Sequence, residues 1–273
     1  MPATHPTRYR CMCLVIRAEG ELRLGEQDAG EPGPGQVLVK VKVKVSLGGI
    51  CGSDLHYFRH GGFGTVRLQQ PMVLGHEVAG TVAALGEGVT ALRIGQGVAI
   101  NPSQPCTGKG AACKFCREGL PNQCLEMRFY GSAMRMPHVQ GAFRNLLLCQ
   151  ASQCVPVADG VGLRLAALAE PFSVGLHAVS RAGSLLGKRV LVSGCGPIGV
   201  LAVAAARVHG AAEVGRLTSW TRRWRWRARW ERRTLATWRR TAAGCSATAP
   251  TKAASTSCWN AAATNVRCAT AWK

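Results

Sequence analysis

The chain has 273 residues, with 34 Lys and Arg against 14 Asp and Glu, and a formal net charge of +20. It is long enough to bury a core without disulfide crosslinks, and glycine, proline, Arg207 and His209 interrupt its most apolar stretch, residues 190–214, which excludes a membrane-spanning helix there. The start of the chain lacks the apolar run of a secretory leader, so we expect a cytoplasmic protein whose 13 cysteines ligate metal rather than form disulfides.

The predicted elements fall into two linked units. Up to about Gln150, β-prone runs such as VLVKVKVKV and EVAGTVAALG alternate with glycine and proline, which predicts a partly open barrel of short strands. From about residue 167 the pattern becomes helical, and RVLVSGCGPIGVLAVAAARVHG then reads as one strand, one tight turn and one helix. The expected fold class is therefore a β-rich domain followed by an incomplete α/β domain with a doubly wound parallel sheet.

Three metal-competent side chains, Cys51, His76 and Glu77, lie beside glycines in GICGSDLHYF and PMVLGHEVAGTV. A catalytic zinc takes thiolate, imidazole and carboxylate ligands and keeps one position open for water or substrate. Glu170, in LAEPF, is predicted to be the third ligand beside Cys51 and His76. Each residue alone is explained by a buried thiol, a hydrogen-bonded histidine or a glutamate at a helix start, but the combination favours a zinc site.

A second cysteine group lies in PCTGKGAACKFCREGLPNQC. The C-x2-C spacing of Cys113 and Cys116, followed by Cys124, is typical of a metal knuckle. Cys106 precedes them across TGKGAA, so four thiolates could close a tetrahedral structural zinc site. The alternative is a loop with incidental cysteines.

The turn GCGPIG has the G-x-G-x-x-G pattern between an apolar strand and an alanine-rich helix. This context predicts a dinucleotide site, although the pattern alone is often only a turn. The predicted cofactor-binding residues are Gly194, Gly196, Pro197, Ile198 and Gly199. The acidic residue for the ribose hydroxyls is expected about 20 residues further on, where the pattern has stopped, so the cofactor is predicted as NAD or NADP.

The composition changes abruptly near Gly215. All seven tryptophans lie beyond it, with 13 Lys and Arg against Glu231 as the single acid, and no periodic apolar face for packing. The explanations are a nucleic-acid-binding arm, a disordered basic tail, or a GC-rich gene translated in the wrong frame. The last is favoured, because a shifted reading of STSCWN permits FDVLLE, an ordinary buried strand. Residues 215–273 are therefore predicted to be disordered, leaving one strand and one helix of the dinucleotide unit.

These motifs, with LAEPFSVGLHAV, together resemble the zinc-dependent medium-chain alcohol and polyol dehydrogenases over about residues 12–214. The segment MRFYGSAMRMPHVQGAF is more narrowly similar to the L-idonate 5-dehydrogenases of the sorbitol dehydrogenase-like branch. The resemblance implies a GroES-like catalytic domain over residues 12–166 and the start of a Rossmann domain over residues 167–214. It also implies NAD(P)-dependent oxidation of L-idonate to 5-keto-D-gluconate, and a homo-oligomer if the chain is intact.

By position, the resemblance assigns Cys51, His76 and Glu170 to the catalytic zinc, with Glu77 beside it. It assigns the structural zinc to Cys106, Cys113, Cys116 and Cys124. In relatives the first of these four cysteines lies closer to the second than it does here, and this chain also lacks the rest of the Rossmann domain.

In an intact relative, zinc lowers the pKa of a secondary alcohol and the hydride leaves for the nicotinamide. Ser53 is the predicted first proton relay, and a helix N-cap is its alternative role. Asp54 and His56 are predicted to orient the site or relay protons, and Tyr57 to line the substrate pocket or to pack in the core. The alternative functions are an inactive zinc-binding remnant and, through the Arg/Trp tail, a nucleic-acid binder. Neither nucleic acid nor a membrane is an expected partner.

Overall fold

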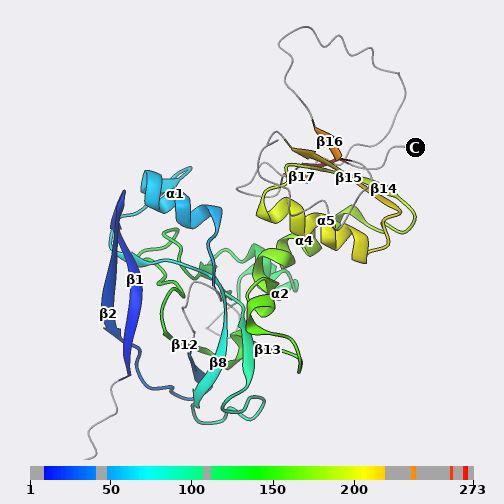
Figure 1. Cartoon of the computed structure of the whole chain (residues 1–273). Helices are drawn as coiled ribbons and strands as arrows, with labels where there is room; N and C mark the ends of the chain where they lie inside the picture. The colour runs from blue at the N-terminus through cyan, green and yellow to red at the C-terminus, as the bar shows by residue number, and fades with distance from the viewer. Residues whose placement is uncertain are drawn as a thin grey trace, which may run out of the picture. The chain divides into compact units, whose positions relative to one another are not determined.

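The computed structural model describes residues 9–40, 48–106 and 112–218, together with three short strands at 235–237, 259–260 and 267–269. The chain divides into two compact units, Met1–Glu170 and Pro171–Lys273. Figure 1 shows the ribbon of both units, with some of their helices and strands labelled.

The first unit is built mainly of antiparallel strands. Five strands hydrogen-bond in the order β12 (Leu146–Gln150), β3 (Gln36–Lys40), β8 (Glu77–Leu85), β9 (Gly97–Ile100) and β13 (Cys154–Pro156). The end of β8 that begins at Glu77 pairs with the short strand β4 (Gly48–Gly49). A second sheet has the order β2 (Glu21–Asp28), β1 (Arg10–Ala18) and β7 (Met72–Val73).

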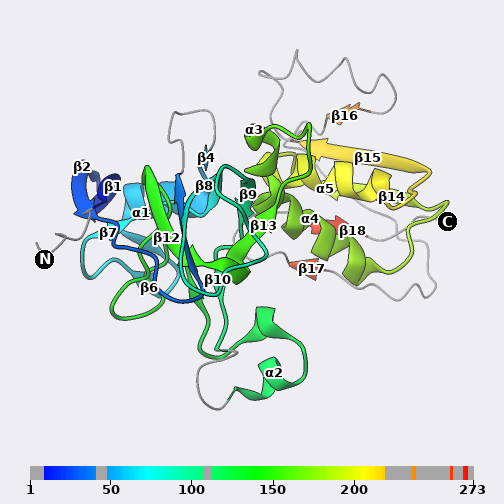
Figure 2. The ribbon, with the colours of Figure 1, turned by 90° about the horizontal axis from the view of Figure 1, so that it is seen from below.

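Shorter elements complete this unit. The two-stranded ladders are β5 (Gly62–Phe63) with β6 (Val66–Arg67), and β10 (Ser103–Gln104) with β11 (Arg128–Phe129). The helices are α1 (Gly52–His60), α2 (Lys114–Arg117) and α3 (Leu163–Ala166), with 3-10 turns at Pro121–Gln123 and Ala151–Gln153. Figure 2 shows the α2 region standing away from the strands of the first unit.

Strand β3 explains how this core forms. Its side chains alternate between two faces, and both faces are buried. Val37 and Val39 belong to the main hydrophobic cluster, whereas Leu38 packs in a second cluster with Cys11 and Ala29. The β-rich first domain predicted from the sequence is confirmed, with β3 and β8 lying in the two runs that predicted strands.

The second unit holds the predicted strand, turn and helix. Strand β14 (Arg189–Ser193) leads through the glycine turn into α5 (Pro197–Val208), and α4 (Ala169–Ala182) precedes them. The sheet has the order β16 (Leu235–Thr237), β15 (Glu213–Thr218), β14, β18 (Arg267–Ala269) and β17 (Trp259–Asn260). The pairs β14–β15 and β15–β16 are parallel, as expected for the opening of a doubly wound sheet.

The structure corrects the predicted end of this unit. Strand β15 runs through Gly215 to Thr218, and Gly215 pairs with Leu191 of β14. Val192 of β14 is fully buried in a cluster that contains Val179 of α4, so the strand does have packing partners. The expectation of one strand and one helix was wrong because β15 supplies β14 with a parallel partner. The remaining residues of the predicted disordered tail, 219–234, 238–258, 261–266 and 270–273, lie outside the described residues.

Within the described part of the chain, no helix is both long enough and apolar enough to span a membrane.

Candidate metal and cofactor sites

Cys51, His76 and Glu77 bring their ligand atoms within 4.8 Å of one another. Cys51 caps the N-terminus of α1, while His76 immediately precedes β8 and Glu77 begins it, so the site forms where a helix start meets a strand start. His76 and Glu77 are buried. The Nδ1 atom of His76 has no hydrogen-bond partner among the described residues. A buried polar atom in this position is costly unless a ligand satisfies it, and thiolate, imidazole and carboxylate together suit Zn²⁺.

Asp54 holds the two ligand segments together. Its Oδ2 accepts a hydrogen bond from the backbone N–H of Cys51 at 2.9 Å, and its Oδ1 accepts one from the backbone N–H of Gly75 at 3.1 Å. The carboxyl group of Asp54 is buried, so neither bond is weakened by competing water. The structure thus supports the predicted orienting role of Asp54, which acts through the backbone on either side of the site.

Gly49 was missed by the sequence analysis, although the doublet Gly48-Gly49 shortly before Cys51 was a visible signal. It pairs with Glu77 in the β4–β8 ladder. A Cβ at Gly49 would overlap the Oε2 atom and the side-chain carbons of Glu77. Glycine is therefore needed here so that the carboxylate of Glu77 can turn toward Cys51 and His76.

Burial raises the pKa of the carboxyl groups of Asp54, Glu77 and Glu170. Electrostatic interaction with His76 opposes this rise in all three, while Asp54 raises the pKa of Glu77, and both Glu77 and Asp54 raise the pKa of Glu170. Burial also raises the pKa of the Cys51 thiol, against hydrogen bonding from Ser53. A divalent cation would favour the ionised forms of these groups, because its positive charge would offset their neighbouring negative charges.

Glu170 lies outside the group of three clustered ligand atoms, which Glu77 completes. Its pKa still responds to the charges of His76 and Glu77, so its carboxyl group lies in the electrostatic neighbourhood of the site. The structure thus favours Glu77 over Glu170 as the third ligand, because Glu77 and not Glu170 belongs to the cluster with Cys51 and His76.

A cavity of about 140 Å³ adjoins His76. It is lined by Ser53, Tyr57, Phe63, His76, Phe129, Gly131, Ser132 and Met134. The hydroxyl oxygen of Tyr57 accepts a hydrogen bond from the backbone N–H of Ala133 at 2.9 Å, which fixes the ring in the wall. The Phe129 ring lies 5.3 Å from the His76 ring, centre to centre. The cavity is thus a small, mostly apolar chamber with a few polar groups, and it lies beside the candidate metal ligand His76.

Two of the three residues predicted around this cavity line it, and the third does not. Ser53 and Tyr57 line it, as predicted for a proton relay and a pocket residue. His56 is exposed on α1, with its ring 5.8 Å from that of His60, and it is not among the lining residues. Its role as a relay stays a prediction. The sequence analysis assigned no role to Phe129, Ser132 or Met134, since the segment that contains them was used only for its resemblance.

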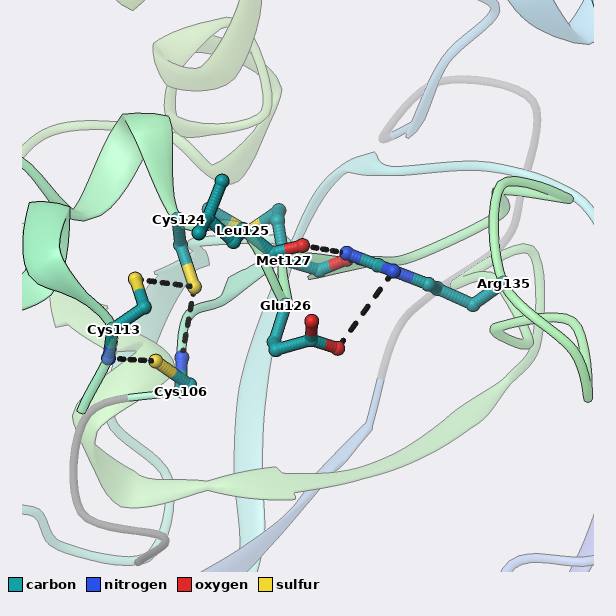
Figure 3. A network of polar contacts seen from close by, with 7 residues as sticks. All are labelled: Cys106, Cys113, Cys124, Leu125, Glu126, Met127 and Arg135. Carbon is teal, nitrogen blue, oxygen red and sulfur yellow. Dashed lines mark hydrogen bonds and ion pairs between the residues drawn. The ribbon is translucent and has the colours of Figure 1, made fainter. Parts of the chain in front are cut away.

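Cys106, Cys113, Cys116 and Cys124 form the second cluster, again with sulfur atoms within 4.8 Å of one another. Two backbone N–H groups donate to sulfur: that of Cys106 to Cys124 and that of Cys113 to Cys106, each at 3.2 Å (Figure 3). Backbone N–H groups of Cys116 and Leu125 lower the pKa of Cys113 to about 6. Such donors stabilise thiolates, and four thiolates in one group suit a tetrahedral zinc. Cys106 reaches the cluster despite its distance along the chain from Cys113.

The glycine turn of the second unit has the predicted geometry. Gly194 has a φ of +88°, which favours glycine, and a Cβ at Gly199 would overlap the carbonyl oxygen of Gly194. Gly196 is the N-cap of α5, and a Cβ there would meet no atom within 4 Å. Pro197 occupies the first turn, where its missing N–H costs nothing. The open side of Gly196 and the N-terminal dipole of α5 suit the approach of a pyrophosphate.

Comparison with known proteins supports this assignment of the two units. The alcohol dehydrogenase GroES-like domain family matches residues 33–159. L-idonate 5-dehydrogenase (NAD(P)(+)) of Escherichia coli strain K12 is 49% identical over 172 residues, which cover 63% of this chain and 48% of that protein. Sorbitol dehydrogenase of Gallus gallus is 41% identical over 203 residues, covering 74% of this chain and 54% of that protein.

Among solved structures, the crystal structure of L-idonate 5-dehydrogenase from Escherichia coli K-12 aligns with a TM-score of 0.71 and 42% identity. The alignment covers 79% of this chain and 59% of the chain in that crystal structure. The chain spans about half the length of the curated relatives it matches. Residues 33–159 thus match the alcohol dehydrogenase GroES-like domain, and over the aligned residues the chain is similar to polyol and sugar-acid dehydrogenases.

Proposed function

We propose that an intact form of this chain oxidises a secondary alcohol of a polyol or sugar acid and transfers the hydride to NAD or NADP. The observation that carries the proposal is the orphaned Nδ1 of His76, a residue that clusters with Cys51 and Glu77 and lines a cavity of about 140 Å³. L-idonate, oxidised to 5-keto-D-gluconate, is the substrate that we propose from the similarity to the Escherichia coli enzyme.

Cys51, His76 and Glu77 would hold a catalytic zinc, and Glu170 would adjust the charge around it. When bound, this ion lowers the pKa of the substrate hydroxyl and so favours loss of its proton. Ser53 would take that proton and pass it on, a role supported by its position in the cavity lining beside His76. Tyr57, Phe63 and Phe129 form apolar walls that exclude water from the reacting carbon.

The turn formed by Gly194, Gly196, Pro197, Ile198 and Gly199 would bind the pyrophosphate of the dinucleotide. The nucleotide would be held by backbone N–H groups at the start of α5 and by the helix dipole. The four-cysteine cluster would hold a second zinc that organises the surrounding loop. Homo-oligomerisation of the intact protein and a cytoplasmic location stay predictions.

Metal analysis combined with two reciprocal substitutions tests the metal assignment. The parent chain should bind two zinc ions, and Cys51→Ser and Cys116→Ser should each lose one of them, because each removes a ligand from a different cluster. A parent chain that binds fewer than two zinc ions, or a variant that keeps both, would contradict the assignment.

Turnover assays separate the proposed function from that of an inactive remnant. L-idonate and D-sorbitol should be tested with NAD and with NADP, using both the 273-residue chain and a chain whose reading frame beyond Val214 has been restored. Oxidation by the restored chain that disappears in Cys51→Ser supports the proposal. Two bound zinc ions without turnover in the restored chain would favour the remnant.

A further inference from the structure

The side chain of Arg135 reaches the residues just after Cys124 (Figure 3). Its Nε donates a hydrogen bond to the carbonyl oxygen of Met127 at 3.1 Å, and its Nη2 donates one to the carbonyl oxygen of Leu125. Its Nη1 lies 3.7 Å from Oε2 of Glu126. The guanidinium group therefore contacts three consecutive residues, 125–127, which directly follow Cys124 of the cluster.

The two hydrogen bonds to carbonyl groups contribute more to this contact than the ion pair does. The side chain of Glu126 is 70% exposed, and an ion pair with so exposed a partner contributes little. The planar guanidinium of Arg135, in contrast, presents donors in a fixed fork that matches two neighbouring carbonyl oxygens. A lysine has the same charge but cannot reproduce that fork.

At its other end, Arg135 belongs to a loop of residues 132–139, here called the cavity loop. The backbones of Ser132 and Val139 exchange hydrogen bonds in both directions, at 3.3 and 3.0 Å, and so close the loop. Nδ1 of His138 donates to the carbonyl oxygen of Arg135 at 2.9 Å, and its Nε2 accepts from the backbone N–H of Gln69, also at 2.9 Å. His138 is thus a buried structural histidine that holds the base of the loop.

The cavity loop also shapes the substrate cavity. Ser132 and Met134 line the cavity, and the backbone N–H of Ala133 bonds to the hydroxyl of Tyr57, another lining residue. Strand β11, which connects Met127 to the cavity, is anchored separately by its pairing with β10. The side chain of Arg135 is therefore a direct link from the end of the cysteine cluster to the cavity loop.

We propose that Arg135 is a positioning residue that couples metal binding at the four-cysteine cluster to the order of the substrate cavity wall. The inference rests on the second metal site described under the proposed function. A bound metal fixes Cys124 and, with it, the carbonyl groups of Leu125 and Met127. Through its hydrogen bonds to these carbonyl groups, Arg135 then restrains the cavity loop. Loss of the metal frees the carbonyls and loosens Ser132 and Met134.

Hydrogen–deuterium exchange of the full 273-residue chain tests this coupling through a double-mutant cycle. The four proteins are the parent, Cys116→Ser, Arg135→Met and the double variant, each with its zinc content measured. In the parent background, Cys116→Ser should speed exchange of peptides from the cavity loop by about tenfold. In the Arg135→Met background these peptides should already exchange rapidly, and Cys116→Ser should change their rates less than about twofold.

Two further variants separate positioning from a general structural effect. Arg135→Lys keeps the charge and should restore part of the protection, because one ammonium group can reach only part of the carbonyl pair. Arg117→Met removes a guanidinium whose Nη1 donates to the carbonyl of Ala112 inside the cysteine region, and it should leave exchange of the cavity loop unchanged. Peptides from β8 serve as an internal reference for the fold in every variant.

An equal response of the cavity loop to Cys116→Ser with and without Arg135 would overturn the coupling, as would no response in a zinc-loaded parent. If Arg135→Met unfolds β8, the same comparison is made in the Arg135→Lys background, where the response should be reduced. A parent without zinc in the cysteine cluster would overturn the coupling together with the second metal site. Turnover is not part of the test, so failure of the dehydrogenase proposal is recognised separately.

Discussion

Gly49 lies opposite Glu77 in the β4–β8 ladder, with no room between them for a side chain. The carboxylate of Glu77 can therefore lie beside Cys51 and His76 because residue 49, on the neighbouring strand, has no side chain. A substitution at Gly49 can therefore test the role of Glu77 in metal binding without changing any of the candidate ligands.

Gly49→Ala should weaken zinc binding at the Cys51 site by about 10- to 100-fold, the range found when groups that orient a ligand are changed. The added Cβ overlaps the carboxylate of Glu77 and pushes it out of the cluster. Competition with a chromophoric chelator measures the affinity. Gly52→Ala is the matched control, because a Cβ at Gly52 meets no atom within 4 Å. Similar affinities in the two variants would show that Glu77 does not need Gly49.

Asp54→Asn should lower the free energy of unfolding by about 1–3 kcal/mol, the cost of an unsatisfied buried group. The carboxylate of Asp54 accepts from two backbone N–H groups, whereas an asparagine amide offers one acceptor oxygen. Urea denaturation measures the change. In the control, Asp28→Asn alters an exposed carboxylate that accepts from Gly30, and it should cost less than about 0.5 kcal/mol. Equal effects would mean that Asp54 has no special role.

Chelation of the metal from the four-cysteine cluster should make the α2 region sensitive to trypsin at Lys114 and Arg117. Among the described residues 112–124, only Cys124 is buried, so this region has almost no core of its own and depends on the metal for its order. Mass spectrometry of the fragments measures the cleavage sites. Cys51→Ser is the suitable background, because it disables the other candidate metal site found among the described residues. Unchanged cleavage after measured loss of zinc would contradict the prediction.

NAD and NADP should not raise the melting temperature of the 273-residue chain, because a ligand stabilises only a state that binds it. The turn at residues 194–199 is formed, but the acidic residue expected to bind the ribose lies where the family pattern has stopped. A chain with its reading frame restored beyond Val214 should show the shift. Calorimetry with each nucleotide decides the question. A clear shift in the unmodified chain would contradict the prediction, and an uninterrupted gene sequence would remove the frameshift hypothesis behind it.

Local patterns account for the parts of the molecule that could be predicted. The β-prone runs VLVKVKVKV and EVAGTVAALG predict β3 and β8, because β-branched residues such as valine favour strands. The turn before α5 was predictable as well, since only glycine adopts the φ of Gly194 easily and fits the contact at Gly199. Cysteine spacing likewise predicted the four-cysteine cluster, whose C-x2-C pair lies at the start of the short helix α2.

The sequence by itself therefore determined the elements, the glycine turn and the types of metal-binding residue, because each depends on neighbours only a few positions away. Only the tertiary structure decided that Glu77 rather than Glu170 completes the first cluster, that Gly49 makes room for it, and that Arg135 reaches the region after Cys124. Likewise, no short sequence pattern indicated that β15 pairs with β14 beyond residue 214. These relationships join segments far apart in the chain, and their distances are set by strand pairing and packing that no short pattern contains.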